Sequence, residues 1–185
     1  MTGGRGIGVL VSGTGSNLQA LIDAGLPIAA VASNVAGAPA LARAASAGAP
    51  VAVFALDAYP DRDTRDAAMA EWLASHDVGI VVCAGYMHLL RPVFLSRFPS
   101  RVVNVHPALL PAFPGAHAVE DALAAGATET GATVHLVDEG IDTGSVLAQE
   151  AVAVLPGDTP ETLHARIRAV EHRLLPEIVR ELVAA

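Results

Sequence analysis

Short apolar runs rich in β-branched residues alternate along this chain with Ala- and Leu-rich stretches of helical period. The runs predict strands over residues 7–11, 28–32, 51–54, 79–84, 102–105, 132–137 and 146–154. The stretches between them predict helices over residues 16–24, 39–47, 61–75, 119–125 and 160–183. Strands that alternate with helices are typical of βαβ units, so we expect an α/β fold with a mostly parallel, twisted sheet flanked by helices.

The length of the chain predicts a single domain over residues 1–185. At 185 residues, 52% of them hydrophobic, it can bury one proper core, and no linker, repeat or low-complexity tract divides it. Run 79–84 carries no charge, as expected for a central parallel strand buried on both faces. In the last helix Thr159 is the expected N-cap before Pro160, and Pro176 predicts a kink or an interruption.

The composition excludes several classes of function. The net charge is -8 and all eleven basic residues are Arg, so we expect no nucleic-acid partner, which needs clustered cations along a phosphate backbone. Cys83 is the only cysteine, which excludes an internal disulfide, and its apolar surroundings predict a buried side chain. Residues 1–5 lead directly into the first strand and no apolar run reaches bilayer length, so we expect a cytoplasmic protein without a signal peptide or membrane span.

A glycine-rich turn, residues 12–17, joins the first strand to the first helix. Gly13 and Gly15 allow backbone conformations that side chains would block, and the helix N-terminus behind them offers unpaired N–H groups to an anion. The turn matches neither the dinucleotide pattern nor a P-loop, and a plain turn with Ser16 capping the helix is the alternative. Because ligands collect at the carboxyl ends of parallel strands, we favour a phosphate site that uses no lysine.

Two polar residues, Asn104 and His106, end the strand over 102–105 and lead into a proline-rich loop. Residues two apart on a strand share a face, so both side chains are expected in one crevice. An Asn amide can stabilise a developing oxyanion and a His can move the proton that the reaction needs. A hydrogen-bonded structural histidine is the alternative.

An acidic glycine loop over residues 138–144 follows the strand over 132–137. Its three carboxylates lack the spacing of a calcium loop, so we expect no metal. A carboxylate beside His106 would fix the imidazole and stabilise its protonated form. Asp142 lies 36 residues after His106 (142 minus 106), so only the fold can bring the two together.

Four segments together resemble the phosphoribosylglycinamide formyltransferases, the folate-dependent enzymes of purine synthesis. These segments are residues 12–18, 84–90, 104–111 and 138–144, and the resemblance covers nearly the whole chain. The Asn-x-His-Pro-x-Leu-Leu-Pro segment is specific to folate formyltransferases, and the Ser-Gly-x-Gly-Ser-Asn loop narrows the resemblance to this family. The resemblance implies a Rossmann-like formyltransferase fold with an antiparallel C-terminal edge strand.

The resemblance also implies the reaction and the residues that serve it. A formyl group would pass from 10-formyltetrahydrofolate, a co-substrate, to the amine of 5'-phosphoribosylglycinamide. The catalytic set would be Asn104, His106 and Asp142. The phosphorylated substrate would be bound by Gly13, Thr14, Gly15, Ser16, Asn17 and Glu171. The reduced folate would be bound by Arg62, Met87, His88, Leu89, Leu90, Asn104, Val137, Asp138, Glu139, Gly140, Ile141 and Asp142. His88 departs from the family pattern, in which Arg often stands at this position.

Two other readings stay open at this stage. One is formyltetrahydrofolate deformylase, in which water replaces the amine, although that family usually has an N-terminal regulatory domain before the first strand. The other is a non-catalytic phosphosugar-binding module, which would need the glycine loop and no acid–base pair. A methionyl-tRNA formyltransferase usually carries a C-terminal tRNA-binding domain, which we do not expect here. We expect the partners to be the two small molecules alone, in a monomer or a homodimer.

Overall fold

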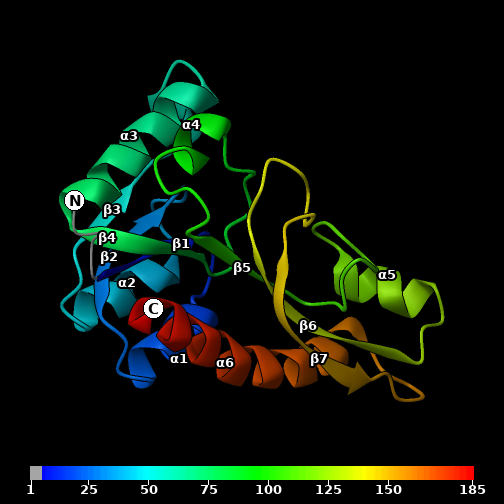
Figure 1. Ribbon diagram of the computed structural model, residues 1–185. Helices are drawn as coiled ribbons and strands as arrows, with labels where there is room; N and C mark the ends of the chain where they lie inside the picture. Colours follow the sequence, from blue (N-terminus) through cyan, green and yellow to red (C-terminus); the bar gives the residue numbers. More distant parts are fainter. Residues whose placement is uncertain (1–5) are drawn as a thin grey trace.

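Seven strands form one sheet in the computed structural model, which describes residues 6–185 (Figure 1). The signal-peptide prediction falls on residues 1–5 and lies outside the described residues. The strands are β1 (Gly6–Val11), β2 (Ile28–Ser33), β3 (Val51–Val53), β4 (Val78–Cys83), β5 (Val102–His106), β6 (Glu129–Leu136) and β7 (Val146–Ala153). Each lies within a few residues of its predicted position.

The sheet has the order β3-β2-β1-β4-β5-β6-β7. The four pairings from β3 to β5 are parallel, whereas β6 pairs antiparallel with both β5 and β7. The expected mostly parallel sheet with an antiparallel C-terminal edge is therefore confirmed. Because the chain moves outward from β1 to β3 and then returns to β4, the strand order reverses between β1 and β4, where open α/β sheets form their ligand crevice.

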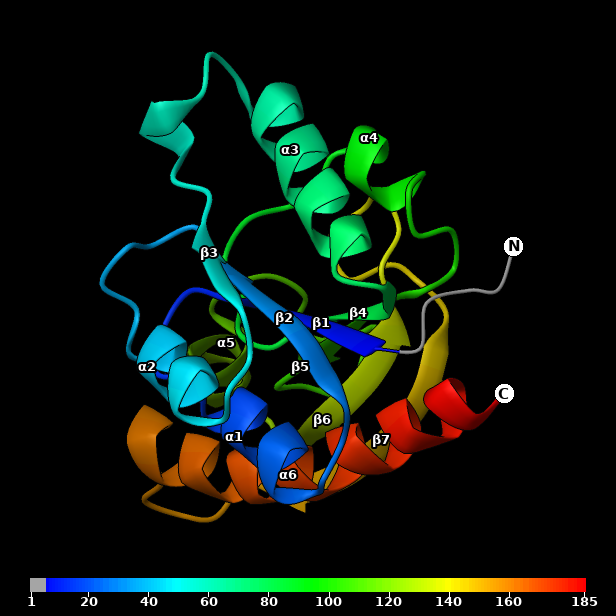
Figure 2. The same ribbon diagram turned by 90° about the vertical axis from the view of Figure 1, so that its left-hand side faces the viewer.

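The helices cover both faces of the sheet. In both views α3 (Arg62–Ser75) and α4 (Pro92–Leu95) lie above the sheet, while α1 (Ser16–Asp23), α2 (Pro39–Ser46) and α6 (Pro160–Ala184) lie below it (Figures 1 and 2). One apolar cluster joins α1, α2 and α6 to the sheet, and a second joins α3 and α4 to it. A third cluster packs α5 (Ala118–Ala124) with α6 against β6 and β7.

The last helix corrects one prediction. Pro176 does not interrupt α6, which runs from Pro160 to Ala184 with Thr159 and Thr162 forming a capping box. Proline removes one intrahelical hydrogen bond. Pro176 is buried, and its helix neighbours Leu175 and Val179 pack in the core, which offsets that loss. Two short elements were not predicted, the 3-10 turn η1 (Leu56–Ala58) and α4 with Pro92 in its first turn.

Helix α3 buries an ion pair. Met69 and Leu73 are fully buried, and Arg65 and Asp66 are also 0% exposed. The Nε of Arg65 lies 2.5 Å from Oδ1 of Asp66. A paired guanidinium and carboxylate can remain charged in such a site because each offsets the desolvation of the other. Burial likewise raises the pKa of the Cys83 thiol to about 12, which confirms that this cysteine is an unreactive core residue.

Among the helices that the structure describes, none is long and apolar enough to cross a bilayer.

The antiparallel pair β6–β7 leaves no room for a side chain at Gly131. A Cβ built there would lie 2.1 Å from the backbone oxygen of Glu150. We expect Gly131→Ala to lower the free energy of unfolding by about 1–3 kcal/mol, because the strands must shift apart. Gly37→Ala is the matched control, since nothing lies within 4 Å of its Cβ position. Urea denaturation of the two variants measures the difference, and equal midpoints would contradict the register of β6 and β7.

Candidate active site

A cavity of about 530 Å³ opens at the carboxyl ends of β1, β4 and β5. Its walls come from the loops after these strands, from the loop between β6 and β7, and from α6. This is the reversal point of the strand order, where the crevice was expected. Every residue predicted to bind substrate or to act in catalysis lines the cavity, except Arg62 and Glu139.

Strand β5 presents Asn104 and His106 to this cavity. The register pairs Asn104 with Cys83 of β4 and with His135 of β6, and pairs His106 with Thr133. Because the two residues are two apart on the strand, both point to the same face, as predicted. His106 is 4% exposed at the floor of the cavity.

The Asp142 carboxylate lies beside both residues. Its Oδ2 is 3.4 Å from Nδ1 of His106, and its Oδ1 is 3.5 Å from Nδ2 of Asn104. The N–H of Gly115 donates to the same carboxylate at 2.8 Å. Asp142 itself has a φ of 54°, a left-handed conformation that non-glycine residues seldom adopt. The structure therefore brings the three predicted catalytic residues together.

The contacts of His106 distinguish its two ring nitrogens. Its Nε2 lies 2.8 Å from the carbonyl oxygen of Phe113. A carbonyl only accepts hydrogen bonds, so Nε2 carries the hydrogen in this contact. Nδ1 faces the Asp142 carboxylate at 3.4 Å, a separation at which the two groups interact mainly through charge.

The proline-rich loop that supplies Phe113 and Gly115 is fastened to the sheet through its backbone. The Thr133 hydroxyl donates to the carbonyl of Ala108 at 2.6 Å, and Nε2 of Gln149 donates to that of Leu110 at 2.7 Å. These side chains come from β6 and β7. The antiparallel edge of the sheet thus holds the loop that orients His106 and Asp142.

His135 completes the cluster, although it was not among the predicted site residues. It is 2% exposed, and its Nδ1–H donates to the carbonyl of Leu136 at 2.8 Å. Its Nε2 lies 3.2 Å from Nδ2 of Asn104 and 3.5 Å from Oδ1 of Asp142. The strand period could have suggested it, since the register pairs His135 with Asn104.

The surroundings of Asp142 lower the pKa of its carboxyl group to about 2. Hydrogen bonding by His135 is the main cause, and the N–H of Gly115 and the charge of His106 act in the same direction against burial. The N–H of Gly115 makes the shortest of these contacts, at 2.8 Å. The cluster therefore places an ionised carboxylate beside Nδ1 of His106 at neutral pH.

The glycine-rich loop forms the opposite end of the cavity. Gly15 has a φ of 77°, and a Cβ there would lie 2.6 Å from Cβ of Ala40, so only glycine fits. Helix α1 begins at Ser16 with Gly15 as its N-cap and no side-chain cap, which leaves its first N–H groups available to an anion. The alternative in which Ser16 caps this helix is wrong.

Helix α6 adds polar groups to this end of the cavity. Glu171 is 3% exposed and accepts from Nδ2 of Asn17 at 3.1 Å, and burial raises its pKa. Arg168 and His164 line the same cavity and were not predicted. Arg168 lies three residues before Glu171 on the same helical face, a spacing that could have revealed it. It lines the same cavity as the glycine loop, where its guanidinium can face a bound anion.

The predicted folate residues form an apolar rim. Met87, Leu89 and Ile141 are 67%, 48% and 53% exposed, so apolar surface is left for a ligand to cover. Arg62 lies outside the cavity lining, with its Nη2 3.5 Å from the carbonyl of Leu89. Glu139 is exposed and also lies outside it.

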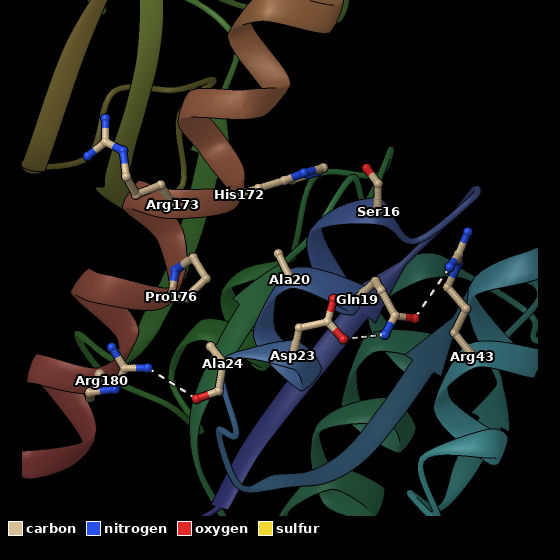
Figure 3. A pocket seen from close by; sticks show the side chains of 10 residues that line it. All are labelled: Ser16, Gln19, Ala20, Asp23, Ala24, Arg43, His172, Arg173, Pro176 and Arg180. Carbon is tan, nitrogen blue, oxygen red and sulfur yellow. Dashed lines mark hydrogen bonds between the residues drawn. The ribbon is translucent and has the colours of Figure 1, made fainter.

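A second pocket of about 580 Å³ lies between α1, α2 and α6 (Figure 3). It is lined by Ser16 but by none of the three predicted catalytic residues. Two of its arginines are already paired, since Arg43 donates to Gln19 and Arg180 donates to the carbonyl of Ala24 (Figure 3). These contacts brace α1 against its neighbours, so the chemistry is assigned to the first cavity.

Known proteins resemble this chain in sequence and in fold. A family model described as formyl transferase matches residues 5–179. A phosphoribosylglycinamide formyltransferase of Mycobacterium tuberculosis is 52% identical over 178 residues, 94% of this chain and 83% of that protein. The trifunctional purine biosynthetic protein adenosine-3 of Homo sapiens is 42% identical over 185 residues, 97% of this chain and 14% of that protein. The crystal structure of glycinamide ribonucleotide transformylase 1 from Symbiobacterium toebii has a TM-score of 0.96 at 45% identity, covering 100% of this chain and 90% of that one.

The low pKa of Asp142 predicts a pH-dependent contribution to stability. Its folded-state pKa of about 2 lies below the usual 3.8, so the ionised group stabilises the fold above pH 3.8, and this contribution is lost as the pH falls toward about 2. Asp142→Asn keeps an oxygen for the Gly115 N–H but removes the charge. We expect the stability advantage of the wild type over this variant, about 1–2 kcal/mol, to shrink over that interval. Urea denaturation at a series of pH values measures it, and a difference independent of pH would count against the ionised cluster.

Proposed function

The chain belongs to the formyl transferase family, and on this premise we propose that it transfers a formyl group from 10-formyltetrahydrofolate to the amine of phosphoribosylglycinamide, a step of purine biosynthesis. The single observation that carries the proposal is that one cavity holds both an Asn104–His106–Asp142 cluster and a glycine loop backed by Arg168. The cluster suits acyl transfer to an amine, and the loop suits the phosphate of that amine's carrier.

In this mechanism the substrate amine attacks the formyl carbon on N10 of the folate. The attack gives a tetrahedral intermediate whose oxygen carries negative charge. The Asn104 amide and the protonated His106 stabilise that oxyanion, since their side chains enter the cavity from the same face of β5. The ionised Asp142 lies 3.4 Å from Nδ1 of His106, where its negative charge offsets the positive charge that the ring carries during the reaction.

Breakdown of the intermediate requires a proton on the departing N10. His106 releases its Nδ1 proton toward that nitrogen and regains one from the attacking amine, so the enzyme returns to its starting state. Glu171, whose raised pKa reflects burial beside Asn17, contacts the substrate's ribose and amine side. The exposed rim of Met87, Leu89 and Ile141 covers the pteridine end of the folate.

The two other readings have less support. A deformylase needs only water as the acceptor, and the glycine loop, Arg168 and Asn17–Glu171 at the far end of the cavity would then have no ligand. A non-catalytic phosphosugar-binding module has no use for a carboxylate held ionised beside an imidazole. We further propose that the partners are small molecules without nucleic acid, because the chain carries a net charge of -8 and no lysine. We also propose that the protein is cytoplasmic and is a monomer or a homodimer.

The first test of the function follows folate deformylation with and without the amine substrate. We expect release of the formyl group from 10-formyltetrahydrofolate only when phosphoribosylglycinamide is present. His106→Ala should lower kcat roughly a hundredfold to ten-thousandfold, because both oxyanion stabilisation and proton transfer are lost. His76→Ala, on a histidine outside the cavity lining, is the control and should keep the wild-type rate. Release without the amine would instead favour the deformylase.

The second test separates the two ends of the cavity. Arg168→Leu should raise KM for phosphoribosylglycinamide about tenfold, because it removes a charge-assisted contact to the phosphate, and should leave KM for the folate nearly unchanged. Arg173→Leu is the matched control, since Arg173 lines the second pocket (Figure 3) and pairs with Glu150. Equal effects of Arg168→Leu on both Michaelis constants would remove the phosphate assignment.

A further inference from the structure

The loop over residues 85–90 lines the cavity and is packed at its two ends. Leu90 is buried in the apolar cluster that joins α3 and α4 to the sheet, and Tyr86 packs against the same cluster. Between them Met87 and Leu89 are largely exposed, so the middle of the loop has little apolar burial to fix its shape. Polar contacts can hold the loop there, and His88, which lies between the two exposed residues, makes such contacts.

The buried ion pair on α3 holds this loop at two places. Nη1 of Arg65 lies 3.0 Å from Nδ1 of His88. The partner carboxylate, Asp66, accepts from the backbone N–H of Arg91 at 2.8 Å. The fully buried pair therefore makes one contact inside the loop and one just after it.

The contact with Arg65 fixes the protonation state of His88. A guanidinium only donates hydrogen bonds, so Nδ1 of His88 must accept and the ring must be neutral. Nε2 then carries the proton and faces the Asn34 amide at 3.4 Å. If the Asn34 amide is rotated by 180°, its oxygen faces Nε2–H of His88 and accepts from it. The amide nitrogen then faces the Ser12 oxygen and donates to it.

Asn34 extends the same network to the glycine-rich loop. The Asn34 amide lies 2.6 Å from the hydroxyl oxygen of Ser12, which accepts from the backbone N–H of Met87 at 2.9 Å. His88 and Met87 of one loop are thus joined to Ser12 of the other through Asn34. The two loops that border the two ends of the cavity share one hydrogen-bond network.

We propose that His88 is a positioning residue for the folate end of the cavity: as a neutral imidazole it accepts from the buried Arg65 guanidinium and so fixes the loop over residues 85–90. This inference rests on the proposed function for the identity of the folate. Protonation of His88 removes the acceptor and places a second cation against Arg65, so the loop loses its attachment in acid.

The charged and titratable groups around His88 support the neutral form. Arg62, Arg65 and Asp66 face it from α3, and the Tyr86 ring lies 5.9 Å from it within the loop. The pKa of His88 is lowered from the usual 6.5 by burial first and then by the two arginines, with Asp66 opposing. His88 is therefore neutral at pH 7 and becomes protonated only below pH 6.5.

Two substitutions at His88 test the role of the acceptor. His88→Leu removes it, and we expect KM for 10-formyltetrahydrofolate to rise about tenfold, with kcat and KM for phosphoribosylglycinamide changed much less. His88→Asn places an amide oxygen near the position of Nδ1, so it should restore most of the wild-type KM. His76→Leu, a histidine of α3's C-terminal end that does not line the cavity, is the control. An unchanged folate KM in folded His88→Leu would overturn the proposal.

If His88→Leu does not fold, two measurements on the wild type and on His88→Asn still test the proposal. Calorimetric affinity for tetrahydrofolate should fall below pH 6.5 in the wild type, and this extra fall should be absent from His88→Asn. Long-range proton–nitrogen NMR should show Nδ1 of His88 without a proton at pH 8, and a protonated Nδ1 would overturn the inference. If no amine-dependent transfer occurs while tetrahydrofolate still binds, the proposed function fails and the binding data still decide the role of His88.

Discussion

The carboxylate of Asp142 joins three segments that are far apart in the sequence. It lies between Asn104 and His106 of β5, His135 of β6 and the N–H of Gly115 in the proline-rich loop. A buried carboxylate is costly unless hydrogen bonds and opposite charge replace its water. Here His135, the N–H of Gly115 and the charge of His106 are those partners, and together they lower the pKa of the Asp142 carboxyl group. The left-handed backbone of Asp142 is maintained by the same contacts.

The sheet topology explains why these segments meet. Strand order reverses between β1 and β4, so the loops that follow them diverge and leave a crevice at their carboxyl ends. The antiparallel β6 then places His135 opposite Asn104 and ends beside Val102, at the start of β5. The loop that follows β6 folds back from there and brings Asp142 beside Asn104 and His106. The antiparallel strand therefore supplies both His135 and the acidic loop to the site.

The sequence predicted the parts of the structure that follow from local pattern. All seven strands, and the shared face of Asn104 and His106, come from periodicities of two and 3.6 residues. The convergence of Asp142 with His106 spans 36 residues, so spacing could not give it and only the family resemblance implied it. The burial of Arg65 and Asp66 was not predicted, because it depends on the pairing of the two side chains and not on the helical pattern. His135 looked like any inward residue of a strand until the register placed it beside Asn104.

An acidic, lysine-free chain can still offer a site to a phosphorylated substrate, because the groups that line the cavity act at short range. Exposed charges more than about 8–10 Å away are largely screened in physiological salt, so the net charge of -8 has little influence there. Beside α1 the local groups are the uncapped N–H groups of that helix, the guanidinium of Arg168, and Glu171, whose pKa is raised by burial. Elsewhere in the cavity the hydrogen bonds of Asp142 lower the pKa of its carboxyl group. Because each charge is set by its own neighbours, one cavity can offer donors to an anion and also hold a carboxylate beside His106.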